Sequence, residues 1–134
     1  MDRESVIPSD LESYYEDWHM SPGRTAGGLL YMTGMTGHRP DGTFAEDAEE
    51  EIRDAFTKID GVLLKAGLDW ENLVEMTSYH VGIRDHIDAF RQVRDEYVRE
   101  PYPAWTAIEV AGFITPAIVE IRAVADATGI QRSK

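Results

Sequence analysis

The sequence contains no cysteine among its 134 residues. This absence excludes disulfide bonds, thiol nucleophiles and cysteine-based zinc or iron–sulfur sites, and it fits a reducing compartment. No apolar run approaches the roughly 18 residues that a membrane-spanning helix needs. The first five residues carry two acidic side chains and precede no apolar stretch, unlike a signal peptide. We therefore expect a cytoplasmic protein that is not bound to a membrane.

Basic residues are scarce, with 13 Lys and Arg against 25 Asp and Glu, so the net charge is −12. Proteins bind nucleic acids largely by neutralising phosphates with cations, and anionic membranes attract basic segments for the same reason. The charge balance therefore predicts that neither a nucleic acid nor a membrane surface is a partner of this chain.

Several chemical motifs are also missing. The sequence has no P-loop, no glycine-rich dinucleotide fingerprint and no serine in a nucleophile elbow. Its four histidines, His19, His38, His80 and His86, lack the spacing of a metal site. The sequence thus predicts no cofactor and no metal, and a structural role for His80 and His86.

The residues that are present predict one folded domain over residues 1–134, with residues 1–18 as an irregular N-terminal arm. Apolar residues at helical spacing predict a helix over 45–66, stopped by Gly67, and a second over 86–99 with Asp85 as its N-cap. Runs rich in β-forming residues predict four strands, the last two as a hairpin-like pair, at 29–33, 73–81, 104–110 and 118–125.

This order of elements predicts an α+β fold, in which two helices cover one face of a single mixed sheet. The other face would then be open. Val119, Ile121 and alternate residues of the last strand would face the helices, and Glu120 would lie on the opposite side with Arg122. A half-apolar open face on a small domain favours self-association.

Glu120 is unusual because it interrupts an otherwise apolar strand. It is either a solvent-facing residue of an alternating strand or a carboxylate with a raised pKa, able to activate water in a partly apolar cleft. Arg122 points to the same side, where it could pair with Glu120 or bind an anion.

Three segments together resemble the RidA/YjgF family, also called L-PSP endoribonuclease-like, and the order of elements agrees over about residues 20–126. The segments are Leu30-Tyr31-Met32-Thr33-Gly34, the run from Pro103 to Val110, and the run from Val119 to Ala125. The resemblance implies a chorismate-mutase-like fold and a homotrimer whose sheets pack into a barrel. It also implies a small-molecule cleft at each subunit interface.

The best-studied members of that family hydrolyse enamines and imines such as 2-aminoacrylate to 2-keto acids and ammonia. An arginine clamps the substrate carboxylate, a glutamate places the attacking water, and backbone groups complete the site. The resemblance assigns the glutamate to Glu120 and the backbone groups to the neighbourhood of Thr33, Gly34 and Ala107.

This sequence departs from the family pattern where the arginine is expected, because Trp105 stands there. An indole offers one N–H donor and an apolar face, and losing a charged contact costs around 2–5 kcal/mol of binding. Trp105 would suit an uncharged aromatic or apolar ligand, or it would plug the cleft. Arg24, Arg94 and Arg122 are possible replacements for the missing cation.

The tyrosine that the family places near the N-terminal wall of the cleft falls at Met20 in this sequence. Tyr14, Tyr15 or Trp18 could take its place. The position where the family often has an asparagine falls at Arg94.

Two functions remain open on this sequence. The first is a small-metabolite hydrolase resembling an imine or enamine deaminase, with Glu120 orienting water, Trp105 stacking on the substrate and an altered substrate. The alternative is a non-catalytic trimer that binds a small molecule or regulates. The acidic charge disfavours the ribonuclease activity that the older family name suggests.

Overall fold

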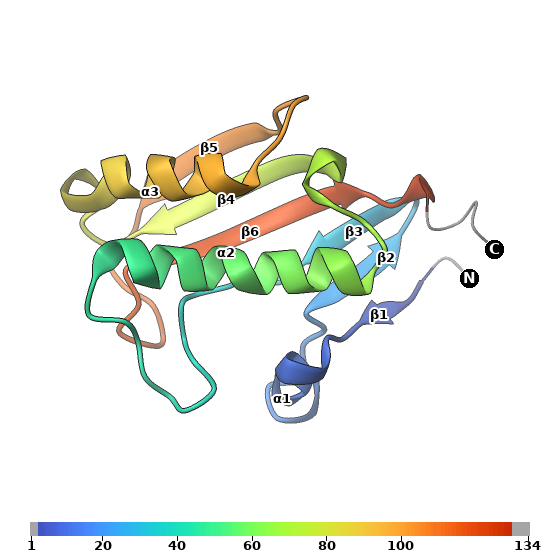
Figure 1. Ribbon diagram of the computed structural model, residues 1–134. Helices are drawn as coiled ribbons and strands as arrows, with labels where there is room; N and C mark the ends of the chain where they lie inside the picture. Colours follow the sequence, from blue (N-terminus) through green and yellow to red (C-terminus); the bar gives the residue numbers. More distant parts are fainter. Residues whose placement is uncertain (1–2, 130–134) are drawn as a thin grey trace.

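Six strands form one mixed sheet in the order β1-β2-β3-β6-β4-β5, and helices cover one of its faces (Figure 1). The computed structural model describes residues 3–129. The strands are β1 (Ser5–Val6), β2 (Gly23–Ala26), β3 (Leu29–Met32), β4 (Leu73–His80), β5 (Ala104–Glu109) and β6 (Val119–Asp126). The predicted α+β fold with two long helices on one sheet face is therefore confirmed.

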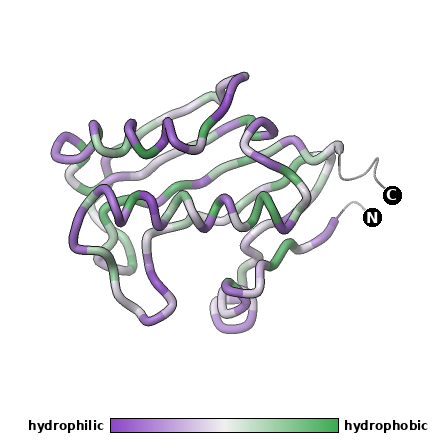
Figure 2. The backbone as a smooth tube through the Cα atoms, in the orientation of Figure 1, coloured by the Kyte–Doolittle hydropathy of each residue, from purple (hydrophilic) through white to green (hydrophobic). Residues whose placement is uncertain are grey.

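The long helix α2 (Ala48–Lys65) crosses the sheet and alternates between hydrophobic and hydrophilic residues along its length (Figure 2). It begins later than predicted, because the side chain of Asp47 caps it by accepting from the N–H of Glu50 at 3.2 Å. Gly67, with a φ of 79°, follows its end as predicted. The apolar stripe of the helix is buried, as expected, at Ile52, Ala55, Phe56, Ile59, Val62 and Leu63.

The second long helix, α3 (Ile83–Tyr97), begins before the predicted start. Its N-cap is Gly82, in the left-handed conformation with a φ of 68°, so the assignment of Asp85 as N-cap was wrong. The N–H of Ile83 donates to Glu109 Oε1 of β5 at 3.0 Å, which satisfies a donor that the helix itself leaves unpaired. A contact distant in sequence thus determines where this helix begins.

The predicted pairing of the last two strands is also wrong. Among the strands of residues 3–129, β5 pairs only with β4, in parallel, and β6 lies between β3 and β4, antiparallel to both. The helix-facing side of β6 is more apolar than that of β5. A central position in the sheet buries this side of β6 along the whole strand. The hairpin of the structure joins β2 and β3 instead, through Gly27 and Gly28, whose φ angles of 60° and 80° suit a tight turn.

The N-terminal arm is more regular than predicted. β1 pairs with β2 at the edge of the sheet, and α1 (Glu12–Glu16) follows a 3-10 turn at Ser9–Leu11. Leu11 is buried against the core. This contact holds the N-terminal arm against the core, and Tyr14 of α1 borders the candidate site.

The two faces of β6 divide as predicted. Val119, Ile121 and Ala123 are buried toward the helices, whereas Glu120 is half-buried and Arg122 exposed on the open face. The register places Glu120 opposite Tyr79 and Arg122 opposite Thr77 of β4. The alternate residues Met76, Ser78 and His80 consequently face the helices.

A buried hydrogen-bonded chain connects β5, β4 and α3. Trp105 Nε1 donates to Ser78 Oγ at 2.9 Å, and Ser78 Oγ lies 2.7 Å from His80 Nε2. His80 Nδ1 in turn lies 3.2 Å from His86 Nε2. The indole can only donate to Ser78, whereas the donor in each of the two histidine contacts depends on the tautomers of the rings. The structural role predicted for both histidines agrees with this arrangement.

Within residues 3–129, no helix has both the length and the apolar composition that crossing a bilayer would require.

The histidine chain makes the stability of the fold dependent on pH. Burial, helped by neighbouring His86, lowers the pKa of His80 to about 4 from its ordinary 6.5, and burial also lowers the pKa of His86. Between pH 6.5 and pH 4, the unfolded chain therefore binds more protons than the folded chain. We expect the free energy of unfolding, measured with urea, to fall as pH drops from 6.5 toward 4, by up to roughly 3 kcal/mol from His80.

The variant His80→Gln, which cannot titrate, should be less stable at pH 7 but show a flatter pH dependence. His19→Asn, at an exposed position with a φ of 57°, is the control and should keep the wild-type slope. An unchanged slope in His80→Gln would contradict the role assigned to this histidine.

Candidate functional site

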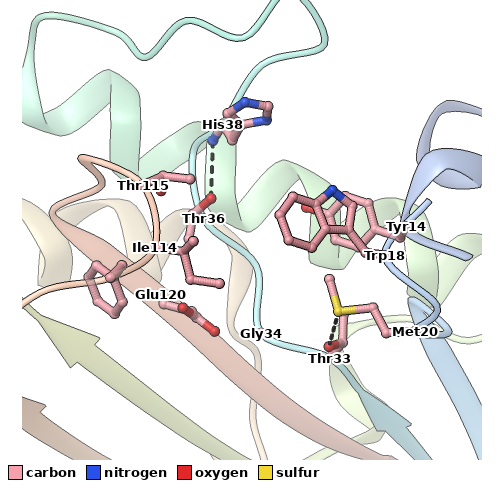
Figure 3. Close-up of a pocket in the computed structure, with 11 residues that line it drawn as sticks. Tyr14, Trp18, Met20, Thr33, Gly34, Thr36, His38, Ile114, Thr115 and Glu120 are labelled. Carbon is pink, nitrogen blue, oxygen red and sulfur yellow. Dashed lines mark hydrogen bonds between the residues drawn. The ribbon is translucent and has the colours of Figure 1, made fainter.

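A cavity of about 230 Å³ opens where β3 ends beside β6 (Figure 3). One wall comes from the N-terminal arm, a second from the chain after β3, and a third from the loop before β6. Its lining residues are Tyr14, Trp18, Met20, Thr33, Gly34, Thr36, His38, Phe113, Ile114, Thr115 and Glu120. The cavity is therefore largely apolar, with one carboxylate.

Glu120 supplies that carboxylate, because strand alternation directs it away from the helix-covered face. No hydrogen bond or ion pair joins its carboxylate to another residue in the described part of the chain. Burial raises the pKa of Glu120 above its ordinary 4.5. The arrangement leaves a desolvated carboxylate with free acceptor positions at the wall of a cavity, which can hold or exchange a proton with a bound molecule.

Gly34 is the residue that allows this placement. A Cβ atom built on Gly34 would overlap Glu120 Oε2 and lie 2.7 Å from its Cδ. The close approach results from the path of the chain after β3, where Met35 forms an isolated antiparallel bridge with Ile121. Any side chain at position 34 would push the carboxylate out of its place.

The N-terminal arm contributes Tyr14 and Trp18 to the cavity, and Met20, just after the arm, adds a third side chain. Met20 Sδ accepts a hydrogen bond from the hydroxyl of Thr33 at 3.5 Å, which ties the arm to the end of β3 (Figure 3). Burial and the nearby charge of Glu120 raise the pKa of Tyr14, so its phenol stays protonated. Of the aromatic residues that the sequence left open for this wall, Tyr14 and Trp18 line it and Tyr15 does not.

The opposite wall was missed by sequence reasoning. It is formed by His38 and by Phe113, Ile114 and Thr115, and Ile114 is 89% exposed. Buried Glu51 of α2 holds this wall, since its carboxylate accepts from the N–H of Ile118 at 2.7 Å. No spacing rule identifies such loop residues, although two adjacent large apolar residues, Phe113 and Ile114, in the Gly- and Pro-containing stretch before the last strand were a usable signal.

Trp105 lies elsewhere, in a cavity of about 490 Å³ lined by Met76, Arg94, Asp95, Val98, Tyr102, Pro103 and Trp105. Its indole stacks on Phe90 of α3, with centroids 5.7 Å apart, and Arg94 Cζ lies 5.0 Å from the ring centroid. The N–H of Trp105 is bonded to Ser78. Much of this side chain is therefore already engaged within the chain.

The expectation that Trp105 and Glu120 share a cleft is not met within one chain. They lie on opposite faces of the sheet, since Trp105 is in register with Met76 and Glu120 with Tyr79. Two strand spacings of about 4.8 Å and three residues of about 3.3 Å also separate them, roughly 14 Å along the diagonal. Trp105 therefore neither lines nor plugs the Glu120 cavity of its own chain.

The remaining predicted residues divide between these places. Thr33 and Gly34 line the Glu120 cavity, and Arg94 accompanies Trp105. Ala107 lies opposite Ser78 on β5 and lines neither cavity. Arg24 and Arg122 are exposed on β2 and β6, and no ion pair joins Arg122 to Glu120.

A sequence model described as endoribonuclease L-PSP matches residues 17–127. The RutC family protein YjgH of Escherichia coli (strain K12) is 32% identical over 117 residues, covering 84% of this chain and 89% of that protein. The chain belongs to the RidA/YjgF family. A solved structure of protein YJGH matches with a TM-score of 0.83 at 28% identity, over 93% of this chain and 96% of the other.

Another relative within the RidA/YjgF family has a named activity. The 2-iminobutanoate/2-iminopropanoate deaminase of Capra hircus is 33% identical over 98 residues, covering 72% of this chain and 71% of that protein. The match to this family confirms the resemblance seen in the three sequence segments.

Replacing Gly34 with alanine should displace the Glu120 carboxylate and lower the free energy of unfolding by about 1–3 kcal/mol, measured with urea. The matched control is Gly61→Ala in α2, where an added Cβ meets nothing within 4 Å. That control should raise stability by about 0.5–1 kcal/mol, because alanine is the better helix former.

A double variant, Gly34→Ala with Glu120→Ala, tests the cause of the effect. Removing the carboxylate removes the overlap, so the double variant should recover part of the loss. Strictly additive effects would show that the two residues do not compete for the same space.

Proposed function

We propose that this RidA/YjgF protein hydrolyses C=N bonds of small imines or enamines, with Glu120 as the residue that orients and deprotonates water. The observation that carries the proposal is the desolvated carboxylate of Glu120, without a protein partner among the described residues, at the wall of an apolar cavity. The named deaminase of Capra hircus supports the choice of reaction.

The chemistry needs one group that can accept and return a proton. Water adds to the carbon of a protonated imine while the Glu120 carboxylate takes its proton. The carbinolamine nitrogen then takes up that proton and leaves as ammonia, while the Glu120 carboxylate accepts the hydroxyl proton as the C=O bond forms and passes it on to the ammonia. One protonated imine and one water thus become one carbonyl compound and one ammonium ion. A carboxyl group with a raised pKa is suited to both steps. The protonated phenol of Tyr14, in the same cavity, can donate a hydrogen bond to the oxygen that the carbinolamine gains from water.

The lining of the Glu120 cavity favours one class of substrate. Within residues 3–129 no lysine or arginine borders it, while Trp18, Met20, Phe113 and Ile114 do. A substrate carboxylate would find no cation there and would face Glu120. The substrate supported by this chain alone is therefore an apolar or aromatic imine rather than a small 2-imino acid.

A homotrimer with the ligand at the subunit interface is part of the proposal. The open sheet face carries Tyr31 and Ile108, which are 41% and 42% exposed, and self-association would cover them. A neighbouring subunit could also bring its own Arg94 and Trp105 toward Glu120. In that arrangement Arg94 would be the displaced cation, and 2-imino acids would again be accepted.

The variant Glu120→Gln separates an enzyme from a binding protein. With an imine generated in situ and ammonia release as the readout, we expect kcat to fall by about 100-fold or more. Ligand affinity should change only a few-fold, because the amide keeps the shape of the side chain. Glu71→Gln, at an exposed position, is the control.

The outcome of the same assay with 2-iminopropionate and with a neutral aromatic imine decides the substrate class. Preference for the aromatic imine supports recognition by the apolar lining. If the wild type and Glu120→Gln bind the ligand equally well and neither turns it over, the result would instead favour a non-catalytic binding trimer.

The rate should depend on pH through Glu120. Because the reaction needs the ionised carboxylate and burial raises its pKa, activity should fall as pH drops, with a midpoint above the ordinary 4.5. A pH–kcat profile measures this midpoint, and Glu120→Gln should lack the acidic limb. An acidic limb retained in the variant would assign the titration to another group.

A further inference from the structure

A third cavity, of about 220 Å³, adjoins the Glu120 cavity and shares Tyr14 and His38 with it. It lies between the N-terminal arm and α2. Its lining also includes Asp10, Arg39, Asp54 and Lys58. Neither the proposed hydrolysis nor the family match assigns it a function.

Lys58 is the chemically distinctive residue of this third cavity. It is half-buried on α2, and its Nζ donates to the hydroxyl of Tyr14 at 3.0 Å. The same Nζ lies 5.5 Å from the centroid of the Tyr14 ring. The amine is thus held against a phenol at the edge of a space that can admit a small molecule.

The surroundings of Lys58 favour its neutral form. Burial lowers the pKa of Lys58 to about 8 from its ordinary 10.5, although the charges of Asp54 and Asp10 oppose the shift. Asp54 is itself paired with Arg39, whose Nε lies 2.9 Å from Asp54 Oδ2. At pH 7 about a tenth of the Lys58 side chains would carry a nucleophilic amine, far more than for an exposed lysine.

We propose that Lys58 is an amine nucleophile that condenses reversibly with the carbonyl group of small molecules entering this third cavity. The neutral amine attacks the carbonyl carbon, and the C=O electron pair moves to oxygen to form a carbinolamine. Loss of water then forms the C=N bond, so one amine and one carbonyl become one imine and one water, with no change of oxidation state.

Tyr14 is positioned to move the protons of this step. Its hydroxyl accepts a hydrogen bond from Nζ and still carries its own proton. It can therefore take a proton from the attacking nitrogen as it gives one to the carbonyl oxygen. The phenol would accelerate both addition and loss of water without itself changing charge overall.

The sequence makes this proposal easy to test, because it has only three lysines, Lys58, Lys65 and Lys134. The intact protein is treated at pH 7 with propanal and cyanoborohydride, which reduces an imine to a stable amine, and the labelled peptides are quantified by mass spectrometry. Lys65 is exposed and near the end of the same helix, so it is the internal control.

We expect Lys58 to be labelled at least tenfold faster than Lys65. Equal labelling, or labelling of Lys65 without Lys58, would overturn the proposal. Tyr14→Phe should slow labelling at Lys58 several-fold and leave Lys65 unchanged, and an unchanged rate at Lys58 would overturn the role assigned to the phenol.

A third variant distinguishes this proposal from the proposed hydrolysis. Glu120→Gln should label Lys58 at a rate within twofold of the wild type, whether or not it hydrolyses imines. Loss of Lys58 labelling in this variant would show that the two cavities act as one site and would contradict an independent amine.

Discussion

The position of β6 at the centre of the sheet is the constraint on which the rest of this structure depends. One face of β6 is buried beneath the helices through Val119, Ile121 and Ala123, and strand alternation leaves Glu120 on the other. A carboxylate is thereby held on a central strand of the sheet, yet outside the core. The bridge between Met35 and Ile121 then brings Gly34 against that carboxylate.

Desolvation of the Glu120 carboxylate raises its pKa. Solvent-exposed carboxylates are ionised and hydrated, whereas Glu120 is half-buried and has no protein partner among the described residues. The apolar lining from the N-terminal arm and the loop before β6 lowers the local polarity, which disfavours the charged form. The same physical effect acts on Lys58 in the adjoining cavity, with the opposite sign because its charged form is the protonated one.

Trp105 is held by contacts within its own chain. Its N–H joins the chain of Ser78, His80 and His86, and its ring packs beneath α3 with Phe90 and Arg94. These contacts explain why an indole is accommodated at this position without reaching the Glu120 cavity of the same chain. The ring of Trp105 also lies beside Arg94, so a cation is present next to the position where the sequence predicted that a cation is missing.

The sequence by itself determined the features that follow from local periodicity. Local sequence spacing is enough to predict the apolar stripe of α2, the end of that helix before Gly67 and the two faces of β6. Only the tertiary structure decided strand order, the start of α3 at Gly82, the orientation of Trp105 and the loop wall at His38 and Phe113–Thr115. Each of these depends on contacts between residues far apart in sequence, such as Ile83 with Glu109 and Lys58 with Tyr14, and no local pattern encodes such contacts.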